Sequence, residues 1–431
     1  MEVFSIVILL FSFLLLLSLG TPVAWSIIIS SLFTLLVSVP FLPALTTISQ
    51  RMATGIDSFA LLAIPFFILS GELMNKGGVA HRLVAFAKAL VGFLPGGLAL
   101  INVISAMLMG SVAGSAMASA SAMGSILGPE MEKEGYSKGF GVAINITSAT
   151  TGLVIPPSNI LIVYSLASGG ASIAALFLAG YIPGILTGLF LMAVAMIWAK
   201  KKNFKTGKRA PLKTVFGSFV RAFPSLMLLF VVIGGIVSGV FTATEASAIA
   251  VIYTLVLGFI YKEITFKTLP TILLKSSTTT AIVMFLIGAS MSMSWVLSYE
   301  NIPEMISSGI LSLSDNKIVI LLLINFTLLF VGIFMDMTPA VLIFTPIFLP
   351  IVTQLGIDPV HFGIIMILNL CIGLCTPPVG SVLFVGVGVA NTSIQKVIKP
   401  LIPLFLAMIV ALLLVTYIPA LSLWLPSIFD L

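Results

Sequence analysis

Long apolar runs alternate with short polar stretches along the whole chain. The runs approach the roughly 20 residues that a helix needs to cross a bilayer, and they fall near 3–19, 22–43, 58–75, 138–165, 172–199, 217–241, 243–261, 276–298, 360–390 and 400–426. Shorter amphipathic stretches, which are too polar to span and are typical of helices at a membrane surface, lie near 44–57, 77–95, 262–275, 299–316 and 391–399. The pattern predicts an all-α, polytopic membrane protein with one fold over the whole chain.

Two further apolar regions, 96–128 and 317–353, are interrupted in the middle. The first carries GSVAGS at 110–115 and the second carries MDMTP at 335–339. The apolar arms on either side look too short to cross a hydrocarbon core of about 30 Å. A stripe of small residues such as GSVAG is also typical of close helix packing. The short arms favour two re-entrant helical hairpins with their tips at mid-depth.

Paired prolines interrupt two of the apolar runs. Pro156 and Pro157 lie in TTGLVIPPSN at 150–159, and proline removes a backbone donor and clashes with the preceding turn, so a helix cannot continue through them. A shift of 221 residues lays these prolines on Pro377 and Pro378, Gly152 on Gly373, and Ser115 on Asp336. The chain therefore contains two repeats, each with one hairpin followed by one broken helix.

Composition excludes a soluble protein. Hydrophobic residues make up 59% of the 431 residues and charged residues only 8%, whereas soluble domains carry about 25% charged residues. The net charge of +6 does not indicate nucleic-acid binding, because the basic residues are concentrated in one loop. Seven of the 20 lie there: Lys200, Lys201, Lys202, Lys205, Lys208, Arg209 and Lys213.

The basic loop also orients the chain, because positively charged loops stay in the cytoplasm. Threading from it places the N-terminus outside and leaves 18 basic residues inside against two outside, Arg51 and Lys317. This division requires both hairpins to enter and leave on one side, the first on the cytoplasmic and the second on the external side. The two repeats then have opposite orientations. Inverted repeats with broken helices mark secondary transporters, whose binding site lies at the repeat interface.

The broken segments predict the chemistry of the site. Freed carbonyls and hydroxyls suit Na⁺, and the N-termini of half-helices suit a carboxylate. We expect two Na⁺ cages, the first built from Ser111, Gly114, Ser115, Asn145, Thr147, Thr150 and Gly152, and the second from Asp336, Thr338, Asn369, Gly373 and Thr376. We expect an anionic substrate between the tips, near Ser158, Asn159, Gly380 and Ser381.

Other polar residues have simpler interpretations. Asp336 could be a merely satisfied buried carboxylate, but an ionisable residue at membrane depth is a functional candidate. We expect structural roles near the membrane surface for Glu72 and Glu245, and solvated or interfacial positions for His81 and His361. Cys371 and Cys375 have no partners at metal-ligand spacing and are expected to pack in the core.

These motifs give the chain a resemblance to the large membrane subunit of tripartite ATP-independent periplasmic (TRAP) transporters. The resemblance covers essentially the whole chain and is most specific in GSVAGSAMASASAMGSILGPEMEKEGYSKGF, TTGLVIPPSNILIVYSLASGGASIAALFLAGYIPGIL and FMDMTPAVLIFTPIFLPIVTQLGIDPVHFGIIMILNLCIGLCTPPVG. It implies an elevator-type carrier of the bacterial inner membrane, driven by Na⁺. It also implies two partners, a small four-helix membrane subunit and a periplasmic substrate-binding protein. Because the chain starts directly at the first helix of the large subunit, we expect the small subunit to be a separate polypeptide.

The resemblance leaves the substrate open among sialic acid, C4-dicarboxylates and other sugar or keto acids. The stretch IPPSNILIVYSLASGG favours the sugar-acid branch and, within it, sialic acid. A stand-alone or H⁺-coupled carrier remains the alternative within transport. An enzyme is disfavoured because the chain has no HExxH, GxSxG or P-loop motif and only two histidines. A purely structural subunit would not need helices broken at mid-depth.

The expected division of the chain follows the repeats. Scaffold helices and an arm occupy residues 1–95. The first hairpin, the first broken helix and the helix after it occupy 96–199, and the basic loop occupies 200–213. A second set of scaffold helices with an arm occupies 214–316, the second hairpin and broken helix 317–390, and an arm with the last helix 391–431. On the external side we expect Glu300 and Glu304 to contribute to docking of the binding protein, unless they are simply solvated.

Overall fold

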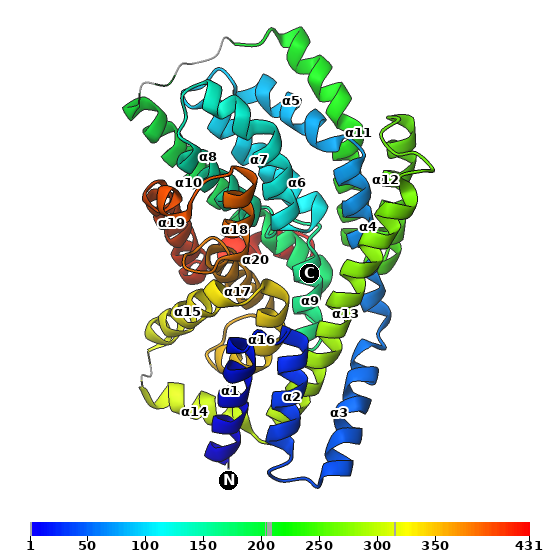
Figure 1. The fold of residues 1–431 in the computed structure, drawn as a ribbon, viewed down its shortest axis with the longest axis vertical. Helices are drawn as coiled ribbons and strands as arrows, with labels where there is room; N and C mark the ends of the chain where they lie inside the picture. Colours follow the sequence, from blue (N-terminus) through cyan, green and yellow to red (C-terminus); the bar gives the residue numbers. More distant parts are fainter. Residues whose placement is uncertain (1, 203, 205–208, 314–315) are drawn as a thin grey trace.

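All regular secondary structure is helical in the residues that the computed structural model describes, which are all except 1, 203, 205–208 and 314–315. Lys205 and Lys208 of the basic loop therefore lie outside the described residues. The elements are α1 (Glu2–Ser18), α2 (Val23–Leu35), α3 (Phe41–Ile56), η1 (Phe59–Leu62), α4 (Ala63–Lys76), α5 (Val79–Val91), α6 (Gly97–Ala113), α7 (Ala116–Lys133), α8 (Lys138–Thr151), α9 (Asn159–Ala167), α10 (Ile173–Lys201), α11 (Leu212–Val237), α12 (Ala243–Ile260), α13 (Leu269–Tyr299), α14 (Ile302–Leu313), α15 (Lys317–Phe334), α16 (Met337–Gln354), α17 (Pro359–Gly373), α18 (Ser381–Val389), α19 (Ile394–Tyr417) and α20 (Ala420–Ile428) (Figure 1).

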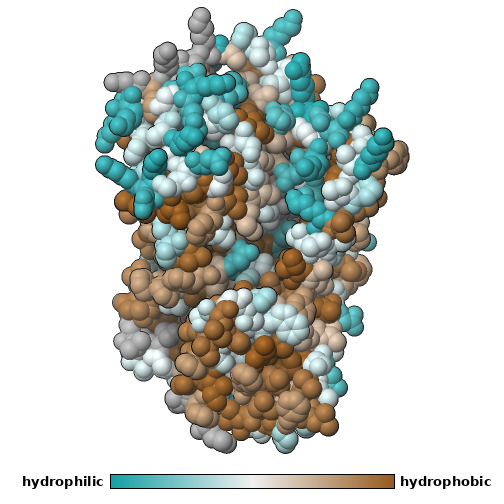
Figure 2. Space-filling model, viewed as in Figure 1, coloured by the Kyte–Doolittle hydropathy of each residue, from teal (hydrophilic) through white to brown (hydrophobic). Residues whose placement is uncertain are grey.

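The membrane character of the fold is clear from helix length and composition. Within the described residues, eight helical segments are long and apolar enough to cross a membrane, and they include α10, α11, α12, α13 and α19. Large apolar side chains on these helices face outward, among them Phe230 on α11 and Ile252 on α12. Figure 2 shows hydrophobic surface over much of this face, while hydrophilic side chains gather at the end of the molecule where α5 and α11 lie. The prediction of an all-α polytopic membrane protein is confirmed.

The two sequence repeats recur as structure. Adding 221 to the bounds of α7, Ala116–Lys133, gives those of α16, Met337–Gln354, and the same shift brings α6 to within one residue of α15 at each end. The broken helices α8–α9 and α17–α18 correspond in the same way, with a cis peptide bond at Pro156–Pro157 in one and at Pro377–Pro378 in the other. Figure 1 shows α5 and its counterpart α14 at opposite ends of the molecule.

Some element boundaries differ from those expected. The run 22–43 gives only the 13-residue α2, because Pro40 precedes a new helix, α3. The polar stretch 262–275 is not a separate arm, since α13 begins at Leu269 and continues without a break for 31 residues. The hairpin arms are also longer than expected, and α15 and α16 each reach the 18 residues of a candidate span.

The helices fall into an inner and an outer group. In the inner group, α6 and α7 pack on α8, α15 and α16 pack on α17, and α8 contacts α17. The outer group includes α1–α4 and α11–α13, in which α4 packs on α12 and α13 packs on α2, α3 and α4. The two groups meet where α4 contacts α6 and α9 and where α13 contacts α16. Residues of the two broken helices and the two hairpins can thus approach the outer helices at one place.

Three expectations for polar residues are decided by the packing. Glu245 has the structural role expected, because it forms a capping box with Thr242 at the start of α12. Cys371 and Cys375 are buried and unpaired, and both thiols lie against the backbone of α8, as a packing role predicts. The prediction for His361 was wrong: its side chain is buried, and its Nδ1 lies 2.6 Å from the Ser422 Oγ of α20.

The docking role expected for Glu300 stays a prediction, although its carboxylate is already engaged inside the molecule. Glu300 lies at the C-terminus of α13 and is only 9% exposed. Its carboxylate accepts hydrogen bonds from the Ser5 hydroxyl at 2.7 Å and from the Ser38 hydroxyl at 2.6 Å. Glu300 therefore ties α13 to α1 and to the turn after α2, and it presents no free charge to a partner. Glu304 is exposed, so the structure leaves a docking role for that residue untested.

Candidate substrate and ion site

A cavity of about 380 Å³ lies where the two helix groups meet. Both hairpin tips line it, the first through Gly114 and Ser115 and the second through Asp336 and Thr338. Leu153 and Asn159 from the first broken helix complete one wall. The opposite wall belongs to α4 and α13. Its volume lies within the 300–1,000 Å³ range typical of small-molecule sites.

The first tip is a tight turn that only a small residue can make. Gly114 has a φ of +59°, a left-handed conformation that favours glycine, and its N–H donates to the Gly110 carbonyl at 2.9 Å. Ser115 then caps α7, because its hydroxyl accepts the Ala118 N–H at 3.3 Å. A Cβ on Gly114 would come within 2.7 Å of the Asn159 amide nitrogen. The tip and the start of α9 are therefore in direct contact.

The second tip places a charge at the position equivalent to Ser115. Asp336 precedes the first turn of α16, but its side chain makes no capping hydrogen bond. The carboxylate is exposed to the cavity, and Thr338 lines the cavity two residues later. An anionic group at one tip and a hydroxyl at the other give the two repeats different electrostatics on the same backbone plan.

Each broken helix is held against its hairpin by a contact between glycines. A Cβ on Gly152 would lie 2.8 Å from the Gly110 Cα, and a Cβ on Gly373 would lie 2.5 Å from the Gly332 Cα. In the second repeat, the Gly380 N–H also donates to the Ile333 carbonyl of α15 at 3.1 Å. The backbone of each break can therefore reach the hairpin without an intervening side chain.

The remaining predicted residues lie behind the cavity wall. Asn145 donates its amide to the Ala120 carbonyl at 2.6 Å and borders a separate small pocket with Asn102. Asn369 donates to the Asn325 side chain at 2.8 Å. The hydroxyls of the other candidates donate to backbone carbonyls, as the hydrogen bonds of Ser111, Thr147, Thr150, Ser158 and Thr376 show.

A hydroxyl that donates its hydrogen still offers lone pairs to a cation. The cavity thus brings together Gly114, Ser115, Asn159, Asp336 and Thr338. Gly152 and Gly373 contact Gly110 and Gly332 of the hairpin arms. Gly380 contacts the second hairpin and Ser381 begins α18, and neither residue lines the cavity. The roles of the predicted ligands remain predictions.

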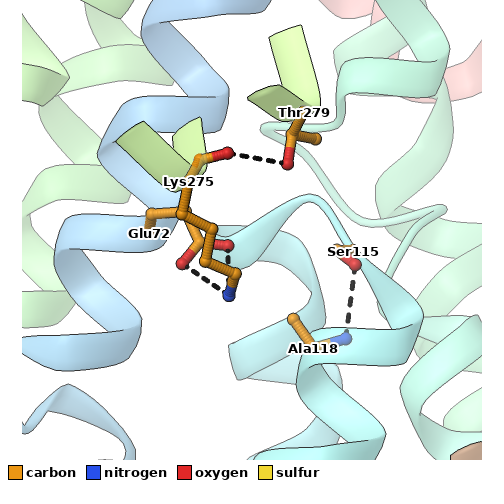
Figure 3. Close-up of polar contacts among 5 residues, drawn as sticks. All are labelled: Glu72, Ser115, Ala118, Lys275 and Thr279. Atoms are coloured by element: carbon orange, nitrogen blue, oxygen red, sulfur yellow. Dashed lines mark hydrogen bonds and ion pairs between the residues drawn. The ribbon is translucent and has the colours of Figure 1, made fainter. Parts of the chain in front are cut away.

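An ion pair across the outer wall was not anticipated from the sequence as part of the site. The Lys275 Nζ of α13 lies 2.9 Å from the Glu72 carboxylate of α4, and both residues line the cavity. Figure 3 shows this pair beside Thr279 and facing the tip that carries Ser115. The Lys275 side chain is 59% exposed, whereas that of Glu72 is 14% exposed. Lys275 is therefore the cationic group that an anion in this cavity would meet.

Comparison with known proteins places the chain in a family. The family model of the tripartite ATP-independent periplasmic transporter, DctM component, matches residues 10–421. The uncharacterized protein YgiK of Salmonella typhimurium is 56% identical over 99% of this chain and 98% of its own length. The sialic acid TRAP transporter large permease SiaM of Vibrio cholerae is 38% identical over 97% of this chain and 98% of its own.

A longer relative and a solved structure extend the comparison. The isethionate TRAP transporter permease DctMQ of Oleidesulfovibrio alaskensis is 41% identical over 96% of this chain, which spans 65% of that protein. The crystal structure of the Alcanivorax borkumensis YdaH transporter superposes with a TM-score of 0.65 at 15% identity, covering 91% of this chain and 90% of that one, and so shares the fold. With a family match over nearly its whole length, the chain belongs to the DctM family of TRAP transporter large membrane subunits and is a multi-pass protein of the bacterial inner membrane.

Proposed function

We propose that this large TRAP subunit imports an organic acid anion with Na⁺ through the cavity between its hairpin tips. The observation that carries the proposal is the meeting of both tips, both broken helices and the Glu72–Lys275 pair around a single cavity of about 380 Å³. Oxygen donors for a cation lie on the hairpin side, and a cation for an anion lies on the outer side. A symporter must bind its coupling cation and its substrate anion at the same time, and this arrangement gives each ion its own side of the cavity.

Sodium fits the hairpin side better than a proton does. The tips offer hydroxyls at Ser115 and Thr338 and a single carboxylate at Asp336. Hard oxygen donors of this kind suit a cation such as Na⁺, whereas proton coupling requires a group that titrates during the cycle. We therefore propose Na⁺ as the coupling ion, bound by one cage at each tip.

The repeat architecture supports an elevator movement of the inner helix group. Each hairpin is packed on its own broken helix through glycine contacts, so α6–α9 and α15–α18 can move as one body. The outer helices α4 and α13 provide the wall past which this body would slide. We propose that both hairpins are re-entrant. The two tips meet in one cavity with α4 and α13, so the other ends of the four hairpin arms point away from that cavity.

The substrate class follows from the cationic wall and from the named relatives. One relative is a sialic acid permease and another an isethionate permease, and their substrates share an anionic acid group. We propose an acid of this kind, with sialic acid as the first candidate on the strength of the stretch 155–170 and C4-dicarboxylates, other sugar or keto acids and sulfonates as alternatives. Lys275 would pair with the acid group.

A periplasmic binding protein and a small membrane subunit are the proposed partners. The fused name DctMQ of the isethionate relative, whose length this chain covers only to 65%, supports the small subunit as a companion. A partner that releases substrate on the external side would dock near α3 and α14, at the end of the molecule opposite to α5 (Figure 1).

Reconstitution tests the function directly. The subunit, its small partner and its binding protein would be placed in liposomes, and uptake of radiolabelled sialic acid, succinate, 2,3-diketo-L-gulonate and isethionate would be measured with and without an inward Na⁺ gradient. We expect uptake of one acid that depends on both the gradient and the binding protein. Uptake that follows a proton gradient without Na⁺ would refute Na⁺ coupling, and uptake without any binding protein would refute the tripartite arrangement.

A further inference from the structure

A second cavity, of about 860 Å³, shares no lining residue with the cavity between the hairpin tips. It is bordered by the first turn of α8, the last turn of α10 and the first turns of α19, which lie together in Figure 1. A Cβ on Gly139 would overlap the Lys396 carbonyl, so α8 and α19 approach each other backbone to backbone here. The cavity has no part in the transport site described above.

Its lining is strongly cationic. Lys138, Lys202, Lys396 and Lys399 line the cavity, and among the described residues no acidic side chain does. Lys138 pairs loosely with Glu132 at 3.6 Å, with both side chains nearly half exposed. Within the part of the chain that the structure describes, no carboxylate lies within ion-pair distance of the other three lysines. The four lysines are exposed and their like charges repel each other weakly, and an anion bound among them would remove that repulsion.

Two further features point to an anion at this place. The N-termini of α8 and α19 both border the cavity, and helix N-termini carry partial positive charge that favours anions. Thr392 is also one of the lining residues, and its hydroxyl oxygen is buried without a hydrogen-bond partner among the described residues. An oxyanion would supply the missing acceptor.

The position along the membrane spans identifies the source of the anion. The cavity lies at the cytoplasmic-loop end of α10 and at the start of α19, both of which are candidate spans. Trp198 forms part of the wall and stacks on Phe140 at 5.2 Å between ring centroids. Tryptophan at the end of a span marks the level of the lipid headgroups, and basic pockets between helices on the cytoplasmic side bind anionic headgroups.

We propose that this cavity binds a phosphate group, supplied by the headgroup of an anionic phospholipid of the cytoplasmic leaflet. Lys396, Lys399 and Lys138 would hold the phosphate oxygens, Thr392 would donate its hydroxyl, and the apolar edge at Trp198 and Pro400 would lie against the upper acyl chain. The bound lipid would hold the start of α8, and hence the first broken helix, to α10 and α19.

Native mass spectrometry of the purified subunit can test this binding. Phosphatidylglycerol, phosphatidylcholine and inorganic phosphate would be titrated separately against the unaltered protein and against the double variant Lys396→Gln/Lys399→Gln. The matched control is Lys262→Gln/Lys267→Gln, which removes the same charge from the loop between α12 and α13, outside the cavity. Each lysine near an anionic membrane surface contributes about fivefold to the affinity for an anionic headgroup. We therefore expect the double variant to bind phosphatidylglycerol about 25-fold more weakly.

The outcomes separate the possible explanations. A loss confined to phosphatidylglycerol and to the Lys396/Lys399 variant supports the proposal, and Lys396→Arg/Lys399→Arg should then restore binding. A loss of inorganic phosphate binding with unchanged phosphatidylglycerol binding would keep the phosphate site but overturn its assignment to a lipid. The site itself would be overturned if the control variant Lys262→Gln/Lys267→Gln lost phosphatidylglycerol binding to the same extent, or if neither variant lost it. Circular dichroism melting of each variant checks that the fold is retained.

Discussion

The two hairpin tips share a backbone plan but differ at one residue. Ser115 and Asp336 occupy equivalent positions at the starts of α7 and α16, and both line the cavity. A carboxylate attracts a cation far more strongly than a hydroxyl does, and more so away from bulk water. The proposed second cage should therefore depend on charge and the first on geometry.

Asp336→Asn should raise the Na⁺ concentration for half-maximal uptake by about tenfold or more, since hydrogen bonds and ion contacts to a charged group contribute about 1.5–3 kcal/mol. Ser115→Ala should raise it by only about threefold, because one neutral ligand of several is lost. Initial uptake rates over a Na⁺ series measure both effects. If both variants kept the original Na⁺ dependence, neither tip residue would be a ligand.

The Glu72–Lys275 pair should matter for transport and hardly at all for folding. Solvent-exposed ion pairs contribute about 0–1 kcal/mol to stability, but the Glu72 side chain is only 14% exposed, so Lys275→Gln should lower the melting temperature slightly. Uptake should fall severalfold, mainly through a higher KM, because the cavity loses the cation that meets the substrate. Lys76→Gln, on the last turn of α4 but outside the cavity, is the matched control. A parallel loss of uptake in that control would assign the effect to general surface charge.

Glu300 should show the opposite behaviour. Its carboxylate holds Ser5 and Ser38 in a buried cluster, and leaving such hydroxyls without an acceptor costs about 1–3 kcal/mol. Glu300→Ala should therefore lower the melting temperature, whereas Glu304→Ala, at an exposed position, should not. Any loss of uptake in Glu300→Ala should not be restored by a higher concentration of the binding protein. Rescue would show that the residue acts in docking after all.

At the scale of elements, the hairpins and broken helices are coupled through glycine. Gly152 and Gly373 each lie so close to a hairpin backbone that a Cβ would overlap it. Gly152→Ala and Gly373→Ala should separate the break from its hairpin, lowering both thermal stability and uptake. Gly128→Ala and Gly388→Ala, where a Cβ would meet nothing within 4 Å, serve as controls and should be neutral or slightly stabilising. Equal behaviour of the two sets would mean that the contacts are loose.

The elements were largely predictable because their signals are local. Two tips and two proline breaks at a shift of 221 residues mark the hairpins and broken helices, and the structure reproduces that shift in α7 and α16. Boundaries were missed where a local signal was ambiguous. The polar residues at 262–275 indicate a surface arm, but helix propagation from Leu269 costs little once α13 packs on α3 and α16.

At the scale of the whole molecule, the sequence did not predict those cavity residues that are far apart in the chain and meet only in the folded protein. Glu72 and Lys275 are 203 positions apart and lie near the ends of their helices, where a charge indicates an interface. Nothing local to either residue reveals the other. Gly114, Ser115, Asp336 and Thr338 line the cavity, and the interrupted apolar runs pointed to them because such an interruption is a local signal. Asn145 and Asn369 were chosen for their positions ahead of the breaks, and they lie deeper in the core.

The basic residues next to the cavity also predict the side of the membrane to which the cavity opens. Lys275 and Thr279 lie in the first turns of α13, just after the loop that carries Lys262 and Lys267, and Asn75 lies beside Lys76 at the end of α4. Positive segments of this kind stay in the cytoplasm. We therefore expect the cavity in this structure to open inward, with the binding site closed toward the periplasm.

Cysteine labelling from either side of the membrane tests this orientation. Cysteines would be introduced at Glu134, Thr279 and Ser427 in a background in which the buried Cys371 and Cys375 are replaced. An impermeant maleimide should reach positions 134 and 279 only from the cytoplasmic side and position 427 only from outside, because threading from the basic loop places the C-terminus there. Substrate with Na⁺ should slow labelling at 279 and leave 134 unaffected, since only the former lines the cavity. Labelling of 279 from outside alone would show that the cavity opens to the periplasm, and cytoplasmic labelling at 427 would overturn the threading itself.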